Sequence, residues 1–112
     1  GLPGADHLRD DARVQTLLKK HAASGKYVAA ICAAPKALAQ AGLLDGKTAT
    51  GYPGVLSALK LSTTVIKDSA LEIDGKIVTS RGPGTAMDFA LTLIKLSAGK
   101  AKRDEVNKQL AR

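Results

Sequence analysis

The sequence predicts a layered α/β domain built on a largely parallel β-sheet. Short apolar stretches alternate with stretches of helical periodicity along the 112 residues, as is typical of strands and helices that follow one another in such domains. Aromatic residues make up only 3% of the chain, so its core must use small and aliphatic side chains, which need close packing between layers. The length suits one domain.

The first helix is expected to follow the stretch GADHLRDDAR, which would leave His7 in a loop. Acidic residues near its start and Lys19 and Lys20 later on suit the helix dipole. The SGK stretch at 24–26 should end it. The residues at helical spacing that define this helix are Val14, Leu17, Leu18, His21 and Ala22.

The stretch YVAAI at 27–31 is apolar and predicts a central parallel strand, covered on both faces. After Cys32, Pro35 stands where the first turn of a helix tolerates proline, and Gly42 should end that short helix. The segments that complete the middle of the chain are a short strand at 47–50, one or two helical turns at 54–60 and a β-branched strand at 62–68.

Residues 70–80 predict a β-hairpin, because Asp74-Gly75 is a favoured hairpin dipeptide between two strand-like halves. A glycine-rich turn then leads into a helix that Gly99 ends. Thr85 and Asp88 have the spacing of a capping box at its start. Its broad apolar stripe indicates burial on more than one side. The polar tail at 102–112 shows only weak helical character.

The net charge of +7 raises the possibility of a nucleic-acid partner. The lysines of the chain are spread along it, which favours a solvated basic surface. Few aromatic residues are present to stack on bases, so no nucleic-acid partner is expected. No apolar stretch is long enough to span a bilayer, so no membrane partner is expected either. A single cysteine cannot form an internal disulfide, which favours a reducing, cytoplasmic compartment.

Cys32 is the candidate reactive residue, because a strand followed at once by a helix presents the residue between them at a sharp elbow. Amides at the start of the helix would stabilise a thiolate, and the amide of Ala33 could bind an oxyanion. A lone cysteine beside an apolar strand is more often an inert core residue. The only histidines, His7 and His21, are expected to be structural or surface residues.

Three segments, AAICAAP at 29–35, TATGYPG at 48–54 and DGKIVTSRGPGTAMDFAL at 74–91, resemble the ThiJ/PfpI superfamily. Within it, they are similar to the branch of the parkinsonism-associated protein deglycase. The resemblance implies a flavodoxin-like three-layer sandwich. It also implies that residues 1–112 form the C-terminal part of a single domain, and that the protein is a homodimer.

Carried onto this sequence, the resemblance makes Cys32 the catalytic cysteine and Ala33 and Gly1 the oxyanion donors. Tyr52 and Arg81 would lie in the pocket. Tyr52 stands where some relatives have histidine, and Ala33 stands where the protease-like branch has histidine, which argues against a peptidase. The glutamate that pairs with the family's cysteine would lie in an N-terminal part outside this chain. We therefore expect that part to remain bound as a separate chain.

The resemblance implies a cysteine-dependent, glutathione-independent glyoxalase that converts methylglyoxal to lactate, or a protein deglycase. The substrate would be a small aldehyde, and neither a metal nor an organic cofactor is expected. A redox-sensing stress protein or chaperone, acting through oxidation of Cys32, is the alternative. A basic α/β binding domain with a buried cysteine is a third interpretation.

Overall fold

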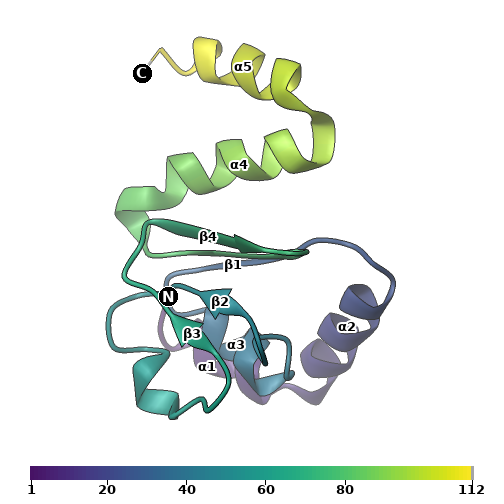
Figure 1. Cartoon of the computed structure of the whole chain (residues 1–112), viewed down its shortest axis with the longest axis vertical. Coiled ribbons are helices and arrows are strands. Elements are labelled where there is room, and N and C mark those ends of the chain that lie inside the picture. Colours follow the sequence, from purple (N-terminus) through teal and green to yellow (C-terminus); the bar gives the residue numbers. More distant parts are fainter. Residues whose placement is uncertain (112) are drawn as a thin grey trace.

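The computed structural model describes residues 1–111, which form three layers with the strands in the middle (Figure 1). One outer layer contains α1 (Gly4–Asp10), α2 (Ala12–Ala23) and α3 (Pro35–Gln40). The other face is covered by α4 (Ala86–Ala98), and α5 (Lys100–Gln109) packs on the side of α4 that points away from the strands. Helices on both faces of the strands confirm the layered α/β class.

The larger sheet has three strands in the order β1-β5-β4. Two of the three strand pairings in the described chain are parallel, β1 with β5 and β2 with β3, and the β4–β5 hairpin is antiparallel. The strands are β1 (Val28–Ile31), β2 (Thr48–Ala49), β3 (Val65–Ile66), β4 (Leu71–Asp74) and β5 (Ile77–Ser80), and two short 3₁₀ turns, η1 (Ser57–Leu59) and η2 (Pro83–Thr85), complete the chain.

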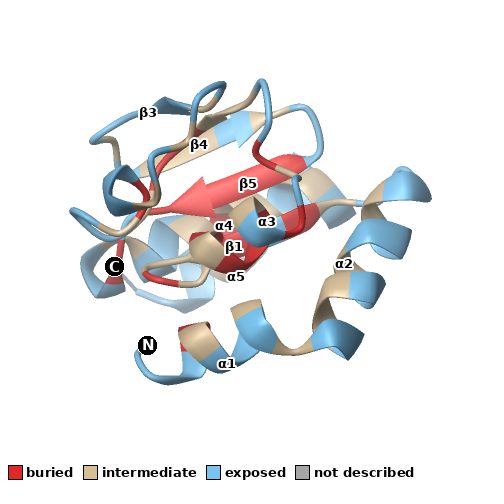
Figure 2. Cartoon of the chain, turned by 90° about the horizontal axis from the view of Figure 1, so that it is seen from below, coloured by how far each residue is buried: buried red, intermediate tan, exposed pale blue. Residues whose placement is uncertain are grey.

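The core lies between the sheet and the layer of α1, α2 and α3. It is made of small and aliphatic side chains, as the shortage of aromatic residues predicts. β5 is buried along its whole length (Figure 2). The residues of the core cluster are Val28, Ala30, Leu38, Leu44, Ala49, Leu56 and Ile77.

β1 is parallel, as expected, but it is neither central nor covered on both faces. It forms one edge of the three-stranded sheet. Val28 and Ala30 are buried in the core, whereas Ala29, which points to the opposite face, is exposed. The apolar sequence indicated burial on both sides, yet the described chain covers only one of them.

Two helices lie where the sequence indicated a loop and a weakly helical tail. α1 contains His7 and is fixed by Ala5, which is buried, and by an ion pair from Asp6 Oδ1 to Lys36 Nζ at 2.5 Å. A hydrogen bond from Lys36 lowers the pKa of the Asp6 carboxyl. α5 packs on α4 and carries an ion pair between Lys100 and Asp104, one turn apart. Neither helix carries a broad apolar stripe, since α1 buries only Ala5 and α5 buries no residue, so periodicity did not reveal them.

The capping box expected for α4 is absent, because the Thr85 side chain does not cap the helix. The Thr85 hydroxyl accepts the Gly82 amide at 3.1 Å and shares a hydrogen bond with the Ser80 hydroxyl at 2.7 Å. η2 immediately precedes α4 and turns this side chain back toward β5. Within α4 only Leu91 is fully buried, although the helix packs on both β5 and α5.

None of the helices within residues 1–111 combines the length and the apolar character needed to cross a membrane.

Candidate active site

Cys32 stands at a sharp elbow between β1 and α3. Its backbone has φ +64°, in the left-handed region that residues other than glycine seldom adopt. The Cys32 amide donates to the Ser80 carbonyl at 3.0 Å, and the Cys32 carbonyl accepts the Tyr52 amide at 2.8 Å. Neighbouring segments on both sides therefore fix this strained conformation, which is common at functional sites.

Gly51 allows the loop after β2 to approach this elbow. A Cβ atom added at Gly51 would lie 3.2 Å from the Cys32 carbonyl oxygen and would crowd it. The adjacent Thr50 amide donates at 2.9 Å to the hydroxyl of Thr79, on β5. These contacts hold the Tyr52 amide against Cys32. Sequence reasoning did not single out Gly51, Thr50 or Thr79, because no local pattern shows which segments lie opposite the elbow.

The amide of Ala33 is unpaired within residues 1–111. The other amides of the turn are occupied: Ala34 donates to the Ile31 carbonyl at 3.1 Å and Lys36 to the Ala33 carbonyl at 3.3 Å. Ala33 is itself buried. A buried N–H group without an acceptor, directly after the cysteine, is available to an oxyanion formed at that sulfur.

The Cys32 thiol is free and half-buried. No hydrogen bond joins it to another side chain in the described part of the chain. Neither histidine supplies a base there. His7 is exposed on α1, and the ring of His21 lies 3.0 Å from the carbonyl of Tyr27, at the opposite end of β1. Residues 1–111 also contain no group of three His, Cys, Asp or Glu side chains able to hold a metal.

The structure brings Tyr52 and Arg81 together. Both line two adjoining hollows, of about 290 Å³ and about 300 Å³. The Arg81 guanidinium pairs with the Asp68 carboxylate at 3.1 Å. Cys32 lines neither hollow and is joined to them through the Tyr52 backbone. Arg81 therefore has a structural partner and still borders space that a ligand can enter.

Gly1 is hydrogen-bonded through its carbonyl group. Its carbonyl accepts the Ala5 amide at 2.9 Å, which starts α1. No hydrogen bond in the described residues joins Gly1 to Cys32. Its place in an oxyanion hole stays a prediction.

These features define a class of protein: a three-layer α/β fold with an unpaired cysteine at a strand–helix elbow. Residues 1–96 match the DJ-1/PfpI family. The chain belongs to that family, and its fold is flavodoxin-like.

Curated relatives agree with this assignment. The chain is 46% identical over 108 residues to Protein DJ-1 homolog A of Arabidopsis thaliana, covering 96% of this chain and 28% of that protein. It is 41% identical over 110 residues to Protein dj-1beta of Drosophila melanogaster, covering 98% and 59% of the two. The chain thus spans less than two thirds of the length of these relatives.

Solved structures are similar as well. The crystal structure of Drosophila melanogaster DJ-1beta superposes with a TM-score of 0.92 at 39% identity, covering 99% of this chain and 60% of that one. Toxoplasma gondii DJ-1, in its oxidized form, gives a TM-score of 0.89 at 38% identity, with the same two coverages.

Proposed function

We propose that this chain carries the nucleophile of a glutathione-independent glyoxalase that converts methylglyoxal to lactate, with deglycation of early aldehyde adducts as a related activity. One observation carries the proposal. Cys32 is held at a left-handed elbow directly before the buried, unpaired amide of Ala33. A nucleophile beside an oxyanion donor is the arrangement that addition to a carbonyl requires.

The reaction begins when the Cys32 thiolate adds to the aldehyde carbon, forming a C–S bond and an oxyanion that accepts the Ala33 amide. An acid/base group then moves the proton from the aldehyde carbon to the neighbouring ketone carbon through an enediol. This shift oxidises the first carbon and reduces the second, so no external oxidant is needed. Water hydrolyses the resulting lactoyl thioester and releases lactate and the thiolate.

No group in the described residues hydrogen-bonds the thiol, which favours an acid/base group from another part of the protein. We propose that the rest of the same protein supplies it and binds as a separate chain along β1. The Val28 amide donates to the carbonyl of Lys76, just before β5, and the Cys32 amide donates to the carbonyl of Ser80, the last residue of β5. Since alternate residues of a strand point their backbone groups to opposite sides, the amides of Ala29 and Ile31 face the open edge.

Substitution of Cys32 by alanine in the complete protein tests the proposal. Methylglyoxal consumption and lactate formation should both disappear, while circular dichroism stays unchanged. A His7→Ala control should keep normal activity, because His7 is exposed on α1. Lactate formation by the alanine variant at the wild-type rate would refute the role of Cys32.

Redox sensing is a second candidate, favoured by the half-buried free thiol and by the oxidized form of the T. gondii relative. A peroxide would oxidise the Cys32 thiolate to a sulfinate in two steps, each transferring one oxygen. Intact mass after peroxide treatment should then rise by two oxygen atoms and should not rise in Cys32→Ala. Catalysis gives many turnovers for each Cys32, whereas sensing gives a single oxidation, so paired assays separate the two functions.

A further inference from the structure

Another hollow, of about 470 Å³, lies beside the N-terminal ends of β1 and β5. We infer that it binds a small phosphate-bearing anion with two or more negative charges. Three lysines from different segments border it: Lys26 before β1, Lys47 before β2 and Lys76 in the hairpin turn. We refer to it as the lysine hollow.

The charge of the lysine hollow is only partly compensated. Lys47 Nζ lies 3.8 Å from Asp74 Oδ1, a weak pairing, and the other oxygen of Asp74 accepts the Thr48 amide at 2.7 Å. Lys26 and Lys76 pair with no carboxylate within residues 1–111. Among the described residues, Asp45 is the acid that borders the hollow. Three lysines around a hollow that one carboxylate borders attract a dianion more strongly than a monoanion.

The shape of the hollow also suits a ligand. Its floor is apolar, formed by Ala22, Leu43 and Ile77, and glycines at positions 42 and 75 keep its rim low. The Lys76 Nζ lies 4.0 Å from the centre of the Tyr27 ring, which does not border the hollow, and this contact leaves the ammonium group without a carboxylate partner.

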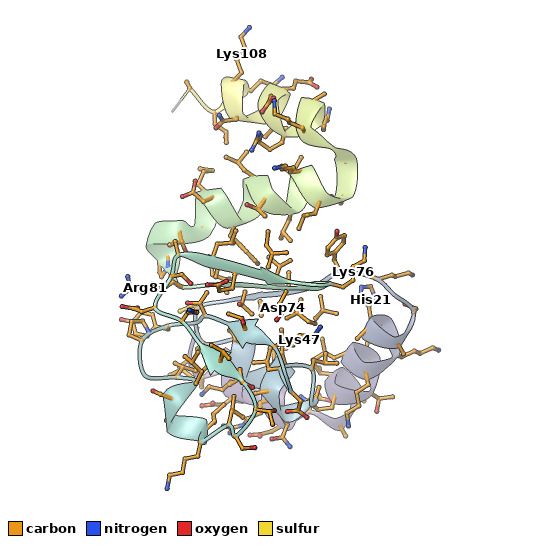
Figure 3. All side chains as sticks on the ribbon, viewed as in Figure 1. His21, Lys47, Asp74, Lys76, Arg81 and Lys108 are labelled. Atoms are coloured by element: carbon orange, nitrogen blue, oxygen red, sulfur yellow. The ribbon has the colours of Figure 1, made fainter. Side chains whose placement is uncertain are left out.

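The lysine hollow is separate from the Cys32 elbow. Figure 3 shows Lys47 and Lys76 toward one end of the strands and Arg81 at the other. Cys32 follows the last residue of β1, whereas Lys26 precedes the first, and a strand of that length spans about 13 Å. Binding at the lysine hollow is therefore independent of the proposed chemistry at Cys32.

The test is a titration of the complete native protein with inorganic pyrophosphate at constant ionic strength, followed by calorimetry and by amide shifts of Gly42, Gly75 and Ile77. We expect saturable binding with shifts at these amides. The variant K26Q/K76Q should weaken it at least about tenfold, equivalent to ~1.4 kcal/mol. The control K95Q/K108Q removes the same charge from α4 and α5 and should change Kd less than about twofold. D45N should tighten binding.

Three outcomes would overturn the inference. The first is no saturable binding at millimolar pyrophosphate. The second is equal weakening by the control pair, which would mean general electrostatic attraction. The third is that citrate binds as tightly as pyrophosphate, which would remove the assignment to phosphate chemistry. A misfolded variant would lose affinity for pyrophosphate. Tighter binding by D45N therefore cannot be explained by misfolding.

Discussion

Cys32 occupies a backbone conformation that favours glycine, and the protein keeps a cysteine there. Its φ of +64° lies in the left-handed region, where a side chain with a Cβ atom costs roughly 1–2 kcal/mol. The apolar strand followed by Pro35 indicated an elbow at this position. The sign of φ did not follow from the sequence, because it is imposed by Ser80 and Tyr52, which are distant along the chain.

This strain predicts a separation between stability and activity. Cys32→Gly should be more stable than Cys32→Ala by about 1 kcal/mol, because glycine adopts the left-handed conformation without the Cβ clash while both variants lose the sulfur. Both should be inactive toward methylglyoxal. Urea unfolding of the complete protein gives the comparison. A glycine variant no more stable than the alanine variant would show that the elbow is unstrained.

At the scale of elements, the site depends on how β2 approaches β5. The Thr50 amide donates to the Thr79 hydroxyl at 2.9 Å, and both residues are fully buried. The Thr50 hydroxyl in turn donates to the Ser69 carbonyl at 2.8 Å. The sequence predicted both strands correctly, but nothing in it paired these two threonines. Tertiary hydrogen bonds of this kind connect segments that no local pattern links.

Replacing Thr79 by valine keeps the volume of the side chain and removes the acceptor. The Thr50 amide is then buried without a partner, which costs about 1–3 kcal/mol. We expect a lower free energy of unfolding and reduced methylglyoxal turnover, because Thr50 precedes the loop that contacts Cys32. Thr79→Ser retains the hydroxyl and should restore activity. A valine variant with wild-type stability and rate would disconnect this hydrogen bond from the site.

α2 supplies a pH-dependent contribution through its N-cap. The Asp11 carboxylate accepts the amides of Arg13 at 2.8 Å and Val14 at 3.4 Å. The Arg13 side chain first, and these amides second, lower the pKa of Asp11 below its usual 3.8. Because the folded pKa is lowered, this stabilisation is present above pH 3.8 and is lost as the pH falls through the folded pKa.

Asp11→Asn keeps a capping side chain without the charge, so it isolates the titrating part. We expect the wild type to melt at a higher temperature than this variant at neutral pH. The difference should shrink as the pH falls from about 5 to about 2. Thermal melts across that range measure it. A constant difference at all pH values would mean that the carboxylate charge does not stabilise α2.

At the scale of the whole molecule, the alternation of strands and helices predicted the three layers, and the resemblance predicted the flavodoxin-like fold. The sheet order could not be predicted, because a strand that is apolar on both faces resembles a central strand even where it lies at the edge of the sheet, as β1 does in the described chain. Ala29 points to the face opposite the core and is exposed. The apolar sequence of β1 therefore indicated more burial than the described chain gives it.

Proline substitutions along β1 test whether another strand pairs with its open edge. Val28→Pro removes the hydrogen bond from the Val28 amide to the Lys76 carbonyl, at 2.8 Å, and should increase aggregation of the chain. Ala29→Pro removes an amide that faces the open edge, where proline is tolerated and blocks edge-to-edge pairing. It should reduce aggregation of the isolated chain and also abolish its association with the rest of the protein.

Light scattering of the isolated chain and affinity co-purification with the separately expressed remainder measure these two effects. The opposite responses of neighbouring substitutions are the signature of an edge that receives a strand, because only the outward-facing amide belongs to the new pairing. If Ala29→Pro binds the remainder of the protein as well as the wild type does, the remainder does not pair with the open edge of β1. The acid/base group proposed for Cys32 would then have to reach the thiol by a route other than strand addition at β1.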